Sequence, residues 1–145
     1  MVEVGDPPIQ LRVAATIPAR PADAFARLLD CDRYHDWWPL RVRAIQGQEG
    51  AIEVRPLPGV RIVMVQQPRE GEDELTYAYL RGPLRGTGTW RVRPVDGGTE
   101  VEYTIRLRPV NALIGLLAAT PLFRFKHGRD VRGIIRRLGA EAVDA

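Results

Sequence analysis

The sequence predicts a single α+β domain in which an antiparallel sheet of about seven strands is covered by a long C-terminal helix. Three observations support this fold. Seven segments between residues 9 and 108 alternate apolar and polar side chains with the period of two that marks a half-buried strand. Short turns join the last six segments, which implies an antiparallel meander. The one long amphipathic segment, 120–142, follows the strands and can cover their apolar face.

The first strand is expected at 9–17, where one face carries Ile9, Leu11, Val13, Ala15 and Ile17. A helix over 21–30 follows, which Pro21 can open as its first residue. Its apolar residues recur at helical spacing: Ala22, Phe25, Leu28 and Leu29. Residues 32–38 are predicted to form a second short helical turn that Pro39 ends. These two short helices would plug one end of the sheet.

Six further strands are predicted by alternation and by the turn residues between them. Their expected ranges are 40–46, 51–55, 60–67, 74–81, 84–94 and 99–108. The turn Asp96-Gly97-Gly98 marks a hairpin between the last two. Polar positions on these strands, such as Arg91 and Arg93, are expected on a solvated sheet face, where Glu53 and Arg55 could pair with each other.

Two helices are expected after the strands. Asn111 can cap a first helix over 112–119, and Thr120 with Pro121 can start a second that runs to about residue 142. One stripe of the second helix recurs at steps of three and four: Thr120, Phe123, His127, Val131, Ile134 and Leu138. Arginines occupy the other positions. We therefore expect Phe123, Ile134 and Leu138 to be buried. Arg132 and Arg136 are expected to be exposed.

Composition limits the class of protein. The 145 residues, 45% of them hydrophobic, suit one domain, 1–145, with residues 1–8 expected to be flexible. The net charge of +3 is spread along the chain rather than gathered in a basic stripe, so we expect no nucleic-acid partner. The N-terminus lacks the pattern of a signal peptide, which favours a cytoplasmic location. The apolar run 110–123 is too short to span a bilayer.

Several kinds of catalysis are excluded or limited by the residues. The chain has no serine, so serine hydrolase chemistry is impossible. Cys31 is the only cysteine, which excludes an internal disulfide and a cysteine-based zinc site. Cysteine–histidine catalysis would need Cys31 with His35 or His127. Nucleotide-binding and metalloprotease motifs are missing, and we expect neither a cofactor nor a metal. Cys31 is predicted to be a free thiol that ligand binding does not need.

Three stretches resemble the START-like superfamily, in particular its polyketide cyclase/dehydrase and coenzyme Q-binding branches. The first is 13–45, with Pro21-Ala22-Asp23-Ala24-Phe25 and Trp37-Trp38-Pro39. The second joins Gly82-Pro83-Leu84-Arg85 to Trp90 and to 97–101, and the third is the C-terminal helix. The resemblance implies a helix-grip fold, a curved seven-stranded sheet round the last helix with a cavity between them. Members bind polyketides, lipids, sterols or quinones, and only some are enzymes. No distinctive catalytic set could be matched, so the catalytic residues stay unknown.

The candidate ligand-binding residues are the large amphipathic side chains and one histidine: Trp37, Trp38, Tyr77, Tyr79, Trp90, Tyr103, Phe123 and His127. Only one of the adjacent tryptophans is expected to face inward. His127 lies in the middle of an apolar stripe, where it either contacts a ligand or is a hydrogen-bonded core residue. His35 is expected to be exposed. Small residues on the cavity elements would leave room for a ligand: Gly86, Gly88, Gly128 and Gly133.

Two functions fit these residues. One is binding or transport of a small hydrophobic molecule, a lipid, quinone or polyketide-like compound, in the internal cavity. The other is a cyclase or dehydratase that acts on such a molecule and uses His127 or a tyrosine as acid or base. Because few ionisable residues fall on inward faces, the sequence favours the binder. The run 110–123 with the arginines after it could also contact anionic membranes, although core packing explains it equally well.

Overall fold

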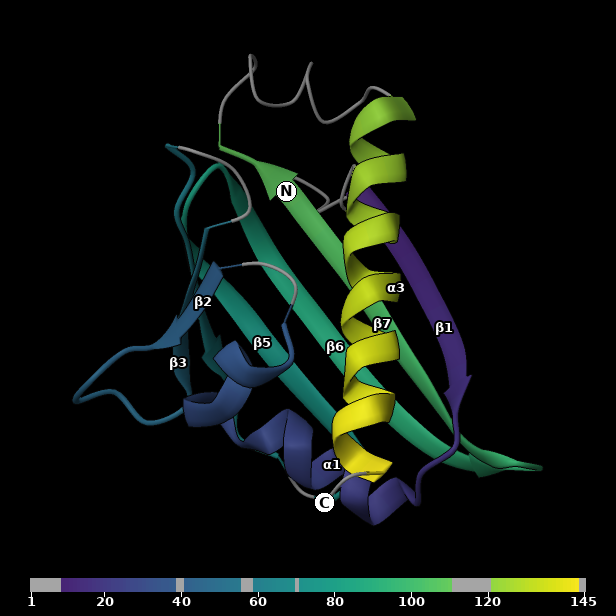
Figure 1. The fold of residues 1–145 in the computed structure, drawn as a ribbon. Helices are drawn as coiled ribbons and strands as arrows, with labels where there is room; N and C mark the ends of the chain where they lie inside the picture. The colour runs from purple at the N-terminus through teal and green to yellow at the C-terminus, as the bar shows by residue number, and fades with distance from the viewer. Residues whose placement is uncertain (1–8, 39–40, 56–58, 70, 111–120, 144–145) are drawn as a thin grey trace, which may run out of the picture.

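A curved seven-stranded sheet and a long helix across its concave face make up the computed structural model (Figure 1). The structure describes residues 9–38, 41–55, 59–69, 71–110 and 121–143, the last range without the side chains of 121–125, 127–128 and 141–143. The strands are β1 (Ile9–Ile17), β2 (Arg41–Ala44), β3 (Ala51–Arg55), β4 (Ile62–Gln66), β5 (Glu74–Arg81), β6 (Leu84–Val95) and β7 (Gly98–Pro109). The helices are α1 (Pro21–Leu29), the 3₁₀ helix η1 (Cys31–Asp36) and α3 (Pro121–Val143). The expected helix over 112–119 and residues 1–8 lie outside the described residues.

The sheet has the order β1-β7-β6-β5-β4-β3-β2, and every neighbouring pair is antiparallel. Strands β2 to β7 therefore form the predicted meander. Strand β1 closes the other edge by pairing with β7, with Ile9 opposite Leu107 and Ile17 opposite Thr99. The chain crosses from β1 to β2 through α1 and η1, which lie together at one end of the sheet (Figure 1). The predicted α+β architecture is confirmed.

Glycine allows two features of the β6–β7 hairpin. Val95 is in register with Gly98, so a two-residue turn joins the strands, and Gly97 has a φ of 86° there. Gly86 has a φ of 141°, and a Cβ at this position would lie 2.1 Å from the carbonyl oxygen of Arg106. A side chain at Gly86 would therefore separate β6 from β7.

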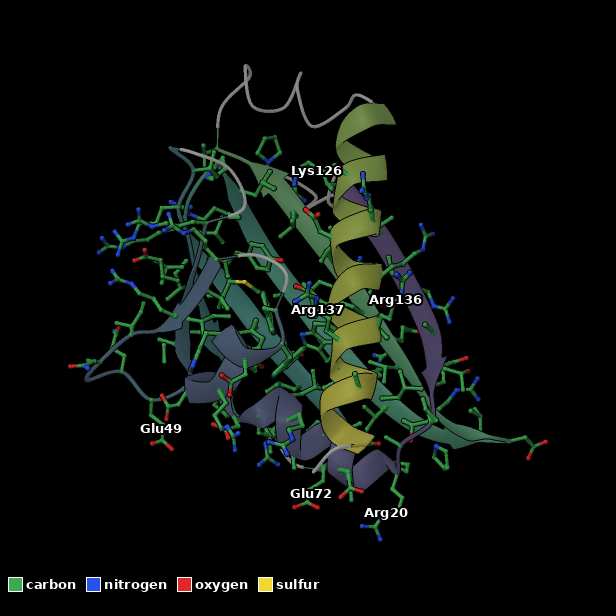
Figure 2. The ribbon with its side chains drawn as sticks, in the orientation of Figure 1. Arg20, Glu49, Glu72, Lys126, Arg136 and Arg137 are labelled. Carbon is green, nitrogen blue, oxygen red and sulfur yellow. The ribbon has the colours of Figure 1, made fainter. Side chains whose placement is uncertain are left out.

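Helix α3 buries the predicted stripe against the sheet. Val131, Ile134 and Leu138 are buried together with Ile135, whereas the arginines between them are exposed, as expected for Arg132 and Arg136. Figure 2 shows Arg136 and Arg137 projecting from α3. The helix approaches β1 closely at Gly139, where a Cβ would lie 2.9 Å from the Cγ2 of Ile17. The side chain of Phe123 is outside the described residues.

The N-terminal helices close one end of the core, as predicted. Helix α1 contacts both α3 and β6, and its buried residues are Ala24, Phe25 and Leu28. Ala22, which was expected on the apolar face, is exposed. The reason is that α1 turns its Ala24 side toward the core, and Ala22 lies two residues away on the opposite side of the helix.

The convex face of the sheet is solvated and carries ion pairs, as predicted for Arg91 and Arg93. The Nε of Arg91 lies 2.9 Å from Oε2 of Glu74, and the Nε of Arg93 lies 2.9 Å from Oε1 of Glu100. All four side chains lie on outward positions of neighbouring strands, so each pair crosses the sheet surface.

Candidate ligand cavity

A small cavity of about 60 Å³ lies between α3 and the concave face of the sheet. Its walls come from β3, β4, β5, β6, β7, α3 and the segment after η1: Trp38, Val54, Ile62, Met64, Tyr79, Trp90, Tyr103, Asp130, Val131 and Ile134. Most of these side chains are apolar and buried. The structure thus brings four of the predicted site residues to one cavity: Trp38, Tyr79, Trp90 and Tyr103.

A pair of tyrosine hydroxyls forms one polar feature of this wall. The Oη atoms of Tyr79 and Tyr103 are 2.8 Å apart, and both side chains are buried. The ring of Tyr103 packs on Trp90, with centroids 4.3 Å apart. Gly88 makes room for this arrangement, because a Cβ there would lie 2.1 Å from the Tyr103 hydroxyl. Gly88 was expected to leave room for a ligand, but the side chain of Tyr103 fills this space instead.

Both hydroxyls of this pair stay protonated at neutral pH. Burial raises the pKa of Tyr79 to about 12, although its hydrogen bond with Tyr103 lowers it. The pKa of Tyr103 is raised chiefly by burial and further by Tyr79. One hydroxyl of the pair donates its proton to the other, so the second hydroxyl can donate its own proton to a ligand. The pair is suited to hydrogen bonding and cannot supply a general base at neutral pH.

Both tryptophans of the 37–38 pair are buried, but only Trp38 lines the cavity, as expected for one of the two. The exposed fractions are 3% for Trp37 and 8% for Trp38. The two tryptophans follow the 3₁₀ helix η1 (Cys31–Asp36), and both indoles pack on the ring of Tyr34. Trp38 stacks at 4.9 Å, and Trp37 meets the ring edge-on at 5.2 Å. Each indole Nε1 is buried without a hydrogen-bond partner among the described residues.

Tyr77 does not line the cavity and belongs to a second polar cluster. Its Oη lies 2.9 Å from Oη of Tyr34, 2.9 Å from Nε2 of Gln66 and 3.1 Å from Sγ of Cys31. Tyr34 donates to the carbonyl of Leu28. One arrangement of protons satisfies the chain: the thiol donates to Tyr77, and Tyr77 donates to Tyr34. This cluster ties α1 and η1 to β4 and β5.

Cys31 is buried, as a free thiol, in the second polar cluster. Burial raises the pKa of this thiol, so it is a poor nucleophile. Replacing Cys31 by alanine should preserve ligand binding and lower the free energy of unfolding by about 1 kcal/mol, the worth of one hydrogen bond. Urea denaturation can measure this loss, and Cys31→Ser should recover most of it. Loss of all ligand binding in a folded Cys31→Ala protein would place the thiol in the site.

Asp130 is a cavity residue that sequence reasoning missed. Its carboxylate pairs with Lys126 at 2.7 Å, one helical turn earlier, and its side chain is 22% exposed. The sequence spacing indicates this position, because Asp130 lies three residues after His127 and four before Ile134 and therefore shares their helix face. The predicted stripe contains Val131, the next residue, in its place. Asp130 places one carboxyl group at the wall of an apolar cavity.

Some of the remaining predictions concern residues that the structure does not describe. His127 lies in α3, but its side chain and that of Phe123 are not described, so their place at the cavity stays a prediction. His35 is exposed, as expected, with its Nε2 3.0 Å from Asp36. Most of the run 110–123 is also outside, so membrane contact stays a prediction. Within the part of the chain that the structure describes, no helix is long and apolar enough to cross a membrane, and no cluster of metal-ligating residues occurs.

Comparison with protein families identifies the chain. Residues 8–143 match the family described as polyketide cyclase / dehydrase and lipid transport. The chain belongs to this family. Polyketide cyclase / dehydrase and lipid transport proteins are START-like, and the resemblance noted in the sequence is therefore confirmed. A search of curated proteins gave no match.

Solved structures share the helix-grip fold of this family member. The protein TTHA0849 from Thermus thermophilus is 16% identical, with a TM-score of 0.78 over 94% of this chain and 98% of its own. The Zhui aromatase/cyclase from Streptomyces sp. R1128 is 17% identical, with a TM-score of 0.71 over 92% and 93%. A START superfamily protein from Mycobacterium smegmatis is 9% identical, with a TM-score of 0.71 over 93% and 97%. At these identities the similarity establishes the fold.

Proposed function

We propose that this protein binds a small hydrophobic molecule that carries a carbonyl or similar acceptor, in the cavity between α3 and the sheet. The family includes cyclases, dehydrases and lipid transport proteins, all of which handle hydrophobic molecules. The lining supports the same class of ligand, because indole, phenol and aliphatic side chains make up most of the wall. A quinone, a polyketide-like compound or a lipid with a polar end would fit this description.

The observation that carries the proposal is the unsatisfied indole of Trp38. Its Nε1 is buried without an acceptor among the described residues, and its side chain lines the cavity. An unpaired buried N–H costs about 1–3 kcal/mol, so a ligand acceptor placed beside it recovers free energy. The Tyr79–Tyr103 pair offers a second donor, a hydroxyl, in the same cavity. A ligand with a carbonyl is therefore favoured over a pure hydrocarbon.

The cavity volume limits how the ligand is held. At about 60 Å³ the space holds only the end of a molecule, whereas ligand pockets commonly have volumes of about 300–1,000 Å³. Binding of a whole lipid or bicyclic quinone therefore requires side chains or α3 to move away from the sheet. Trp38 and Trp90 both line the cavity, so their fluorescence should report this movement.

The adjacent tryptophans give a matched test of the proposal. Trp38→Phe should weaken binding of 1,4-naphthoquinone by about 0.5–1.5 kcal/mol, the worth of one hydrogen bond. Binding of naphthalene, which lacks the carbonyls, should change much less. Trp37→Phe removes an equally buried and unpaired indole that does not line the cavity, and it should leave both affinities unchanged. Equal losses in the two variants, or no quinone binding by the parent protein, would contradict the proposal.

The enzyme alternative rests on Asp130. A cyclase or dehydratase needs an acid or base beside the ligand, and Asp130 is the ionisable carboxylate in the described cavity wall. Its carboxylate is held in an ion pair with Lys126 at 2.7 Å, so a salt bridge already occupies it. The tyrosines keep their protons at neutral pH. The geometry thus favours binding over catalysis, and turnover of a polyketide-like substrate that is lost in Asp130→Asn would reverse this order.

A further inference from the structure

A buried glutamate on the opposite, convex side of the sheet organises several arginines. Glu53 is only 2% exposed, although it occupies an outward position of β3 between Ile52 and Val54, which face the core. Three guanidinium groups cover it. Nε of Arg55 lies 2.7 Å from its Oε1, and Oε2 contacts Nε of Arg61 at 2.7 Å and Nη2 of Arg43 at 3.2 Å. The predicted Glu53–Arg55 pair is confirmed, but it is part of a larger group.

The group contains more positive charge than Glu53 neutralises. Arg41 is directly opposite Arg55 in the β2–β3 register, and like charges in this position repel. No carboxylate of the described residues pairs with Arg41. Three arginines thus contact one carboxylate, and Arg41 adds a fourth positive charge beside Arg55. We call Arg41, Arg43, Arg55 and Arg61 the arginine cluster. Figure 2 shows nitrogen-tipped side chains gathered beside β2 and β3, away from α3.

Elsewhere on the convex face, arginines pair with single carboxylates. Across β1, β5, β6 and β7, Arg12, Arg91 and Arg93 pair with Glu74, Glu100 and Glu102. Exposed ion pairs of this kind contribute little stability. The arginine cluster differs from these exposed pairs because its arginines are held in place by a buried carboxylate that accepts from three sides.

The cluster borders an open hollow with space for a ligand. The hollow measures about 520 Å³ and is lined by His35, Arg41, Val42, Arg43, Glu53 and Arg55. The three arginines that hold Glu53 each contact it through one nitrogen and are 52–71% exposed, so most of their N–H groups remain available. Asp36, beside His35, is paired with Arg33 at 3.3 Å. The charge at the hollow is thus positive.

We propose that the arginine cluster is a second binding site, separate from the interior cavity, that takes a phosphate monoester or pyrophosphate group. Guanidinium groups match phosphate oxygens with paired N–H donors, and several of them from different strands suit a compact group with more than one negative charge. A carboxylate would leave more of the positive charge unneutralised. Glu53 acts as a positioning residue, because it fixes the guanidinium groups before the anion arrives and so lowers the entropy lost on binding.

Calorimetric titration with inorganic pyrophosphate tests the site. The parent protein should bind the probe, and Arg41→Gln with Arg55→Gln should weaken binding by about tenfold or more, since charge-assisted hydrogen bonds are lost. Arg91→Gln with Arg93→Gln is the matched control, because it removes the same charge from the same face, and it should change the affinity by less than about twofold. The 1,4-naphthoquinone affinity should be the same in both double variants, which separates this site from the interior cavity.

A vesicle experiment distinguishes the source of the phosphate. Phosphatidylcholine vesicles with and without phosphatidic acid should be compared in sedimentation with the same variants. Binding that needs phosphatidic acid and the Arg41/Arg55 pair identifies a lipid headgroup, whereas pyrophosphate binding without vesicle binding identifies a free phosphate compound. If the protein binds neither probe, or if both double variants lose binding equally, the arginine cluster is not a phosphate site.

Discussion

Gly88→Ala should lower the free energy of unfolding by about 2–4 kcal/mol and abolish the Tyr79–Tyr103 hydrogen bond. The added Cβ would lie 2.1 Å from the Tyr103 hydroxyl and 2.7 Å from its ring carbon Cζ. Tyr103 cannot move freely, because its ring packs on Trp90 and its hydroxyl contacts Tyr79. Overpacking of a buried ring and loss of its hydrogen bond both contribute. Urea denaturation measures the stability, and 1,4-naphthoquinone titration measures the cavity.

A double-mutant cycle identifies the cause of this loss. In a Tyr103→Leu background the clash is removed, so Gly88→Ala should cost no more than about 1 kcal/mol, the scale of an ordinary surface or strand substitution. Gly97→Ala is a useful contrast, since no atom lies within 4 Å of a Cβ there, and its cost would arise only from its φ of 86°. If Gly88→Ala costs the same with Tyr103 or Leu at the partner position, the clash is not the cause.

Glu53→Gln should lower the free energy of unfolding by about 1–3 kcal/mol at neutral pH. The variant keeps the shape of the side chain but removes the charge that holds Arg43, Arg55 and Arg61 together, and it places an amide NH₂ against guanidinium donors. The loss is smaller than for a fully buried ion pair because the three arginine side chains are 52–71% exposed and solvent screens them. Glu74→Gln, whose ion pair with Arg91 is exposed on both sides, should cost less than about 1 kcal/mol.

The contribution of Glu53 should depend on pH in a defined window. Hydrogen bonds from Arg55, Arg61 and Arg43 lower the pKa of Glu53 from 4.5 to about 2, against the opposing effect of burial. Because the folded pKa is depressed, the unfolded chain takes up the proton first, and the stabilisation is lost as the pH falls from 4.5 toward 2. The difference in unfolding free energy between the parent protein and Glu53→Gln should therefore be full above this window and small at its lower end. A difference that is independent of pH would contradict the role of the ionised carboxylate.

The sequence alone determined the local structure of this protein. Alternation with period two, interrupted by turn residues, predicted the strands β2 to β7 and their antiparallel order, because short loops leave neighbouring strands no other pairing. The apolar stripe of α3 predicted the burial of Ile134 and Leu138 and the exposure of Arg132 and Arg136. The polarity of each position also placed Tyr79, Trp90 and Tyr103 on the inward face. These properties depend on neighbours within a few residues, and a sequence records them directly.

The tertiary structure decided the features that depend on distant segments. Strand β1 pairs with β7, about ninety residues later, because closing the curved sheet brings the first and last strands of the chain together. Alternation could not show that both tryptophans of the 37–38 pair pack on Tyr34, since they follow a 3₁₀ helix. Alternation also could not distinguish the roles of Tyr77 and Tyr79, which share a strand face. Cys31 and Gln66 hydrogen-bond to Tyr77, whereas Tyr79 lines the cavity. Glu53 had the pattern of a solvated residue, and arginines from β2, β3 and the segment before β4 buried it.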